Sequence, residues 1–435
     1  EVELNANVGS NGQHGADVSA AYHGEQLKLH ASAGAQRADG IDAQVNADPD
    51  RDGYRNLSKS ARGGYTFNPQ WSVEGSALRA EGENHYDGYY NYSETLQQVL
   101  GGKLRYTPSE RFNLTVNVGR ADNESDNYNG STWLGAAQTH RNSASVQADV
   151  GIAEGQLLSA GVDWSQDNLD GSSAGYLVDS RDNTGVFVQY QGRFGAHHLQ
   201  ASVRNDDNEQ FGNHTTGSLG WGLELGSGFR LNASYGTAFK APTFSDLYDP
   251  WSGVPTLDPE KSKSANLGIS QQGQGWRWGL DVYETRIDDL ITYDATTFMM
   301  SQVEKARIRG AELTGSLTVA GFDLSAQLSH TDPRNRTGGS TQFDNWLPRR
   351  AQQTALAGHG HGGVFDHVFL PADHLLAAQL DQDVARRQAV LHRRTLGEQQ
   401  EAAVHAGVAQ RERVAVDADR EVHDRHHQVF GHVLD

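Results

Sequence analysis

Apolar and polar residues alternate along much of the first 350 residues of the chain. Residues 112–118 read Phe-Asn-Leu-Thr-Val-Asn-Val, and the same alternation recurs in residues 199–204, 229–235, 276–282 and 322–328. Successive side chains of a β-strand point to opposite faces of the sheet. A period of two therefore predicts strands with one apolar face and one polar face.

Two kinds of connection join these segments. Short turns are expected at residues 23–25, 68–70, 108–110, 154–155, 195–196, 226–228, 273–275 and 320–321. Between them lie long polar stretches, namely residues 40–58, 81–95, 121–139, 165–182, 241–262 and 330–345. Tight turns that alternate with long loops, joined by strands of about ten residues, are typical of an outer-membrane β-barrel. A soluble β-sandwich or β-solenoid, the alternative, does not require this asymmetry.

The composition favours one large all-β unit over several mixed domains. The chain has 435 residues with 49 Gly, 15 Tyr, 14 Phe, 8 Trp and only 10 Pro. No apolar run approaches the ~18 residues of a transmembrane helix. The mean hydropathy of −0.65 still permits a membrane barrel, because alternation averages apolar and polar positions. We therefore predict an antiparallel transmembrane β-barrel.

Charge and cysteine content exclude several other classes. The absence of Cys removes disulfides, thiolate metal sites and thiol nucleophiles. The net charge of −19 argues against nucleic acid as a partner, because no basic stripe is present to neutralise phosphates. No Gly-x-Ser-x-Gly elbow, His-Glu-x-x-His motif or phosphate-binding Gly-rich loop occurs. The sequence therefore predicts a protein that is not an enzyme.

A change of composition near residue 350 divides the chain. Residues 351–435 contain no Trp, Tyr, Lys, Asn, Ser, Ile or Met, yet they hold 10 of the 19 His. Eight tight turns and the flanking segments predict about 17 or 18 strands within residues 1–350. We expect strand structure to stop there and residues 351–435 to form an atypical His-, Ala- and Arg-rich tail. Such a tail is either an off-frame continuation or a partly helical or disordered extension.

Several segments resemble the TonB-dependent outer-membrane receptor family. Residues 234–248 (Ser-Tyr-Gly-Thr-Ala-Phe-Lys-Ala-Pro-Thr-Phe-Ser-Asp-Leu-Tyr), 257–263 and 303–313 are similar to its barrel signatures. Residues 161–164 (Gly-Val-Asp-Trp), 181–187 and 204–212 resemble the branch that takes up cobalamin. The resemblance covers residues 1 to about 355.

This resemblance implies a 22-stranded barrel in the cell outer membrane, surrounded by its lipid. An N-terminal plug would fill the lumen, and TonB would drive uptake of cobalamin or another corrinoid. The sequence starts at Glu1 without a plug or a TonB-contact motif, and a tail replaces about four final strands. We therefore expect an incomplete barrel. A siderophore receptor of the same family, a passive porin and a barrel hydrolase are the alternatives.

Carboxylates are concentrated in two consecutive expected loops. The candidate ligands are Asp42, Asp50, Asp52, Glu83 and Asp87. Calcium takes six to eight hard oxygen ligands, which two facing loops could supply. A solvated acidic loop is the simpler interpretation of the same residues. The resemblance implies calcium as a structural cofactor here, because calcium orders these loops in corrinoid receptors.

Aromatic residues gather at the base of the second loop. Tyr86, Tyr89 and Tyr90 are candidate substrate-binding residues that could contact a corrinoid face. The alternative is an interfacial aromatic belt, which membrane barrels carry at both edges of the apolar band.

Overall fold

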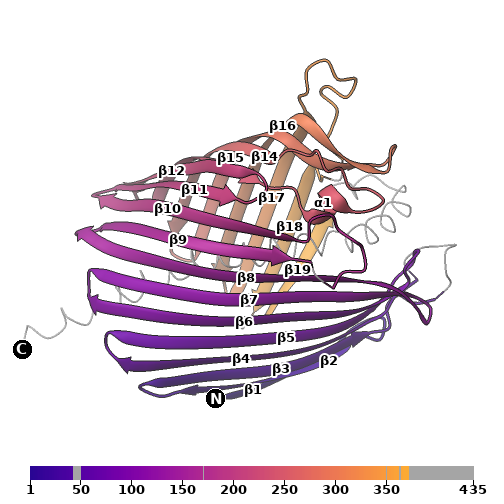
Figure 1. The fold of residues 1–435 in the computed structure, drawn as a ribbon. Helices are drawn as coiled ribbons and strands as arrows, with labels where there is room; N and C mark the ends of the chain where they lie inside the picture. The colour runs from indigo at the N-terminus through magenta and orange to yellow at the C-terminus, as the bar shows by residue number, and fades with distance from the viewer. Residues whose placement is uncertain (43–49, 170, 349, 362–363, 372–435) are drawn as a thin grey trace, which may run out of the picture.

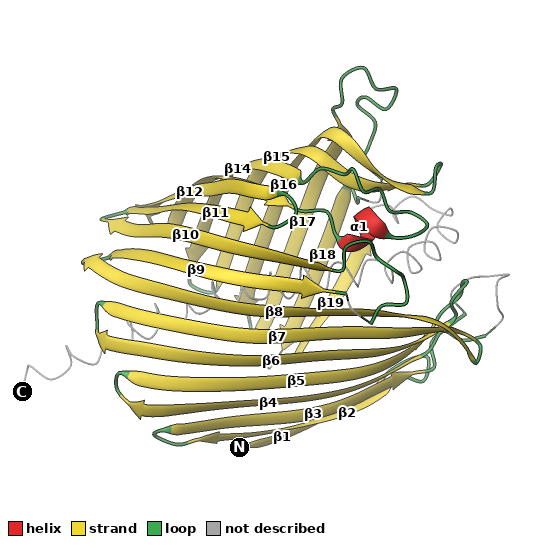
Figure 2. Cartoon of the chain, viewed as in Figure 1, coloured by secondary structure: helices red, strands yellow, loops and turns green. Residues whose placement is uncertain are grey.

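The computed structural model describes residues 1–42, 50–169, 171–348, 350–361 and 364–371. These residues form one antiparallel sheet of 19 strands and a single short helix. The sheet curves around an interior space, with β1 and β19 at its two edges (Figures 1 and 2). The all-β, antiparallel barrel architecture expected from the alternation is confirmed.

The elements follow one another along the chain with short connections. The strands are β1 (Val2–Val8), β2 (His14–His23), β3 (Leu27–Ala38), β4 (Tyr54–Asn68), β5 (Trp71–His85), β6 (Tyr92–Ser109), β7 (Phe112–Asn129), β8 (Thr132–Ala153), β9 (Gln156–Asn168), β10 (Ser180–Phe194), β11 (His197–Asn208), β12 (Gly212–Gly226), β13 (Phe229–Lys240), β14 (Glu260–Gly273), β15 (Trp276–Asp294), β16 (Met299–Val319), β17 (Phe322–Asn335), β18 (Gln353–His361) and β19 (Val364–Pro371). The helix α1 spans Phe244–Tyr248.

Each strand pairs with the next strand in sequence. Eighteen antiparallel pairings run without interruption from β1–β2 to β18–β19. Within the described ranges, no pairing joins β1 to β19, so the sheet is open at this seam. Because the strands alternate in direction, the connections that follow even-numbered strands lie at one end of the wall. The connections that follow odd-numbered strands lie at the other end.

All eight tight turns expected from the sequence lie at one end of the sheet. They connect β2 to β3, β4 to β5, β6 to β7, β8 to β9, β10 to β11, β12 to β13, β14 to β15 and β16 to β17. Glycine supplies the left-handed backbone that such turns require, as at Gly155 (φ 66°) and Gly195 (φ 60°). We call this end the turn end and the opposite end the loop end.

The expected strand length and one expected loop are wrong. The strands β7, β8, β15 and β16 contain 18, 22, 19 and 21 residues, well beyond the ten anticipated. The polar stretch 121–139 is a paired hairpin that turns at Gly130 (φ 57°). Polar Asn, Asp and Ser residues favour loops, but their backbones pair equally well where strands extend past an apolar band.

The expected boundary at residue 350 is also wrong. Strand β18 pairs with β17 from Gln353↔His330 to His361↔Phe322, and β19 pairs with β18. The sheet therefore continues to Pro371. Backbone pairing does not depend on the composition that changes at residue 351. The expected helical or disordered character of residues 372–435 lies outside the described residues.

The wall has an apolar outer face and a polar inner face. Leu219 and Leu267 are 53% and 55% exposed, whereas Arg204, Asp163 and Gln189 line the interior. Aromatic residues follow the outer face at the turn end, where Trp71 stacks on Tyr106 at 4.2 Å. An apolar band with an aromatic edge is the pattern of a membrane barrel. No helix in the described part is long and apolar enough to cross a membrane.

The small buried core lies at the loop end instead of inside the wall. Leu247 of α1 is fully buried, and Leu290, Ala306 and Leu347 form a separate cluster. Thr243 begins α1 with a capping box, since its Oγ1 accepts from Asp246 N (3.0 Å) and Asp246 Oδ2 accepts from Thr243 N (2.9 Å). The β13–β14 connection is therefore a folded structure at the rim.

Candidate functional site

The wall encloses an interior cavity of about 4680 Å³. Its lining comes from the inner faces of β4 to β11 and from loop-end connections, including the residues around Tyr89, α1 and Trp251. A cavity of this size, lined by many polar side chains, can hold a bulky hydrophilic ligand or a folded segment of protein. The residues at its loop-end rim are therefore the candidate ligand contacts.

Ion pairs hold the cavity wall in register. Arg141 donates to both carboxylate oxygens of Asp167 at 2.5 and 2.7 Å. Arg204 donates to Asp163 at 2.6 and 2.8 Å and to Asp206 at 2.7 and 2.8 Å. Such bidentate pairs give a fixed geometry as well as energy. The sequence analysis missed them, because only the strand register shows that Arg141 lies opposite Asp167. The register also shows that Arg204 on β11 reaches Asp163 on β9 across Gly185 of β10.

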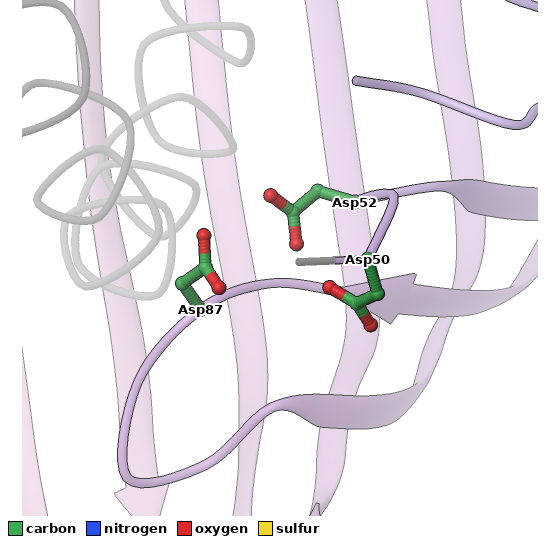
Figure 3. A group of neighbouring side chains, drawn as sticks. All are labelled: Asp50, Asp52 and Asp87. Carbon is green, nitrogen blue, oxygen red and sulfur yellow. The ribbon is translucent and has the colours of Figure 1, made fainter. Parts of the chain in front are cut away.

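Three of the five candidate metal ligands come together at the loop end. One carboxylate oxygen each from Asp50, Asp52 and Asp87 lie within 4.8 Å of one another. Asp50 and Asp52 belong to the β3–β4 connection and Asp87 to the β5–β6 connection (Figure 3). The two loops expected to face each other do so at these residues.

The backbone around this acidic group is tightly specified. Gly40 has a φ of 72°, and a Cβ there would lie 2.0 Å from the carbonyl oxygen of Asp52. The amide of His85 donates to the carbonyl of Gly53 at 2.9 Å, which ties the second loop to the first. Glycine is required at residue 40 because only it allows both this conformation and this approach.

The other two candidate ligands lie elsewhere. Glu83 is part of β5 and forms an ion pair with Arg55 of the neighbouring strand β4. Asp42 is exposed and is not a member of the acidic group. Glu83 lies within β5, where odd-numbered residues such as Val73 point to the outer face. Asp87 lies after the end of β5, so this alternation does not apply to it.

Carboxylate oxygens are the donors that calcium prefers, and three carboxylates can supply up to six of them. The donor set therefore fits a hard divalent cation better than a soft transition metal. Backbone carbonyls and water complete the shell of such ions in proteins. The arrangement can bind a cation that links the β3–β4 and β5–β6 connections.

The three candidate tyrosines occupy the β5–β6 connection next to Asp87. Tyr89 is 75% exposed, and its ring meets that of Tyr90 edge to face at 5.1 Å. Tyr86 is half-buried, and its burial raises the pKa of the phenol above its usual value, so it remains a neutral donor at pH 7. All three residues line the cavity. Their position at the loop end separates them from the aromatic residues of the turn end.

This connection is fastened to the next hairpin. Asn129 Nδ2 donates to the carbonyl of Tyr89 at 2.9 Å, and the amide of Gly130 donates to Asn91 Oδ1 at 2.7 Å. The exposed Tyr89 ring is therefore presented by a braced backbone. Little further ordering would be needed when it contacts a ligand.

A second part of the rim was missed by the sequence analysis. The Arg181 guanidinium lies 4.7 Å from the Phe244 ring of α1 and donates to the carbonyl of Pro242 at 2.9 Å. Gln210 Nε2 donates to Tyr248 Oη at 2.7 Å. These contacts join the start of β10 and the β11–β12 connection to the β13–β14 connection that contains α1. The Thr-x-x-Asp spacing of its capping box was the available signal.

Comparison with known proteins identifies related chains. The family profile described as TonB dependent receptor-like, beta-barrel matches residues 5–374. The chain is 29% identical over 330 residues to the vitamin B12 transporter BtuB of Photobacterium profundum, covering 73% of this chain and 54% of that protein. It is also 29% identical over 330 residues to BtuB of Vibrio vulnificus, covering 71% and 52%.

A solved structure with a similar fold is a mutant of the ferric enterobactin receptor PfeA from Pseudomonas aeruginosa. Its TM-score is 0.70 at 14% identity, covering 83% of this chain and 65% of that one. A likeness at this identity concerns the fold alone. The chain spans about half the length of the curated relatives that it matches.

Proposed function

The chain belongs to the TonB-dependent receptor-like β-barrel family, and we propose that it is the barrel part of a receptor that takes up cobalamin or another corrinoid. Its location is the outer membrane, as for the family. In this proposal the loop-end rim captures the ligand, and TonB acts on the whole receptor to release it inward. The role of this chain is binding and transport.

The proposal of a corrinoid as the ligand rests on one observation. Two relatives named vitamin B12 transporters share 29% identity over 330 residues of this chain. Ferric enterobactin receptors have a similar fold at 14% identity, which does not bear on the ligand. The cavity rim with its exposed Tyr89 suits a ligand with a large, partly apolar ring system. A ferric siderophore remains the competing ligand that an experiment must separate.

Calcium forms part of the same proposal. The carboxylates of Asp50, Asp52 and Asp87 would hold the ion between two connections whose mutual repulsion it would reduce. A bound cation would bring the tyrosine-bearing β5–β6 connection into a fixed position before the ligand arrives. Preorganisation of this kind lowers the ordering cost of ligand capture.

Ligand choice can be tested with the gene product that contains this chain, expressed in outer membranes. Saturable binding of radiolabelled cyanocobalamin that excess ferric enterobactin does not displace is the expected result. Saturable binding of ferric enterobactin without cyanocobalamin binding would show that the transported ligand is a siderophore and not a corrinoid. Binding of neither ligand, with correctly folded protein in the membrane, would contradict the proposed receptor function.

The calcium proposal is tested by the double substitution Asp50→Ala and Asp52→Ala. We expect cyanocobalamin affinity to fall about tenfold in calcium buffer, equivalent to ~1.4 kcal/mol of lost loop ordering. Without calcium, the variant and the parent protein should bind alike. Equal losses in both buffers would mean that these carboxylates contact the ligand or support the fold. Asp42→Ala is the matched control, since Asp42 lies outside the acidic group.

A further inference from the structure

The outer face of β14–β17 carries an unusual set of cations at the loop end. Directly opposed residues of antiparallel strands point to the same face. Leu267 is opposite Val282, and Leu313 is opposite Leu328, and all four are exposed on the outer face. Residues of the same parity nearer the loop end therefore also point outward, away from the cavity.

Four of these residues form one row of positive charge. Lys263 is opposite Arg286, Arg286 is opposite Arg307, and Arg307 is opposite Arg334. Cross-strand neighbours have their Cβ atoms ~4.5–5.5 Å apart, and like charges placed so are destabilising. The fold therefore tolerates four adjacent cations on the neighbouring strands β14–β17. We call this set the cationic row.

The carboxylates around the row leave an excess of positive charge. Glu284 is shared between Arg286 (2.7 Å) and Arg309, and Asp332 is shared between Arg334 (2.6 Å) and Arg307 (3.4 Å). Among the described residues, Lys261, Lys263 and Lys305 take part in no ion pair. Seven cations thus share the outer face with three carboxylates, namely Lys261, Lys263, Arg286, Lys305, Arg307, Arg309 and Arg334 with Glu284, Asp288 and Asp332.

The row also has spare hydrogen-bond donors in fixed positions. Each shared carboxylate engages only part of two guanidinium groups, which leaves other N–H donors of Arg286 and Arg309 unused at the exposed surface. The Arg334 guanidinium lies 3.5 Å from the centroid of the Trp346 ring, which holds it in place. A guanidinium presents a rigid fork of donors that matches the oxygens of a phosphate.

The level of the row along the strands indicates where a partner must lie. Leu267 and Val282 lie four residues from Lys263 and Arg286 on their strands, toward the turn end, a distance of ~13 Å. The cations therefore lie beyond these apolar residues, toward the loop end. In outer-membrane barrels the long loops face the exterior. The row therefore lies at the headgroup level of the outer leaflet.

We propose that the outer face of β14–β17 binds a phosphate-bearing glycolipid of the outer leaflet. Its phosphates would contact the cationic row, and its acyl chains would lie along the apolar band below. The lipid is favoured over a protein partner because the cations continue directly from a lipid-facing surface. This inference depends on the outer-membrane location and not on which ligand the receptor transports.

The test uses the detergent-purified gene product that contains this chain and lipid A, a glucosamine disaccharide with two phosphates, as the probe. The variant Lys263→Gln with Arg286→Gln should lower lipid A affinity in native mass spectrometry about thirty-fold, since two cations at ~1 kcal/mol each correspond to that ratio at ~1.4 kcal/mol per tenfold. The matched control is Arg55→Gln with Lys59→Gln on β4, which should leave the affinity unchanged. Heat-modified migration on gels confirms that each variant is folded.

Three outcomes would overturn the proposal. Equal losses in the β14–β15 variant and the β4 control would mean general charge attraction. Unchanged binding of lipid A stripped of its phosphates would mean that acyl chains alone account for it. Full displacement of lipid A by millimolar inorganic phosphate would assign the row to a free anion, whereas retention of the lipid under phosphate supports the glycolipid.

Discussion

The loop-end outer faces of β4–β7 and β14–β17 carry rows of opposite charge on the same type of wall. On β4–β7, Arg55 is opposite Glu83, Glu83 is opposite Glu94, and Glu94 is opposite Asp126. On β14–β17, the cationic row contains Lys and Arg alone. Backbone pairing is the same in both regions, so only the side chains at alternating positions set the sign.

The two rows also differ in how their charges are balanced. In the acidic row, Glu83 pairs with Arg55, Glu94 accepts from Tyr92 Oη at 2.9 Å, and Asp126 accepts from Trp133 Nε1 at 2.9 Å. In the cationic row, pairs of arginines share single carboxylates, and Lys263 has none among the described residues. Each carboxylate of the acidic row (Glu83, Glu94 and Asp126) thus has a donor within the protein. The cationic row has more positive than negative charge and can bind an external anion.

Both rows should lie at the exterior end of the barrel, and cysteine labelling tests this location with the largest expected effect. The chain contains no Cys, so single introduced thiols are unambiguous. Gly338→Cys in the β17–β18 connection should react fully with a membrane-impermeant maleimide on intact cells. Ala196→Cys in the β10–β11 turn should react only after the outer membrane is permeabilised. The reverse pattern would place the cationic row in the inner leaflet.

Transfer of the cationic pattern to β4–β7 should create a second lipid-binding surface. The combined substitutions Glu83→Lys, Glu94→Lys and Asp126→Lys would place four cations in one row with Arg55. We expect one additional lipid A molecule per protein in native mass spectra, because the new row would lie beside the same type of apolar surface. An unchanged lipid count in a folded variant would show that the guanidinium forks of β15–β17, and not the row of charge, are decisive.

A smaller effect is expected on stability in the absence of lipid A. Lys263→Gln removes a like charge beside Arg286 and should raise the free energy of unfolding in detergent by about 0.5 kcal/mol at low ionic strength. Glu94→Gln should change it little, since Tyr92 can still donate to the amide oxygen. Urea titrations at low salt and at 0.5 M NaCl provide the measurement. Screening should remove the gain in the Lys263 variant, and a gain that persists at high salt would point to packing instead.

Alternation and turn residues were sufficient to predict the architecture. The period of two indicated strands, and all eight short turns appear where Gly, Pro and Asn punctuate the pattern. Both signals are local, since side-chain direction and turn conformation depend on a few consecutive residues. Strand ends were not predicted, because polar residues such as those at 121–139 can pair as strands or form loops. The boundary at residue 350 failed for a related reason, since β18 pairs through its backbone whatever its composition.

The candidate site was predictable in part. The resemblance to corrinoid receptors singled out Asp42, Asp50, Asp52, Glu83 and Asp87 in the two acidic stretches, and the structure brings Asp50, Asp52 and Asp87 together. The resemblance could not exclude Glu83, because only the position of the strand end decides whether a carboxylate joins the rim or faces outward beside Arg55. Local sequence patterns thus specify the strands, their two faces and the short turns. Register and strand length, which depend on pairing between distant segments, decided which charges meet, and only the tertiary structure supplied the acidic group, the bidentate pairs of the cavity wall and the cationic row.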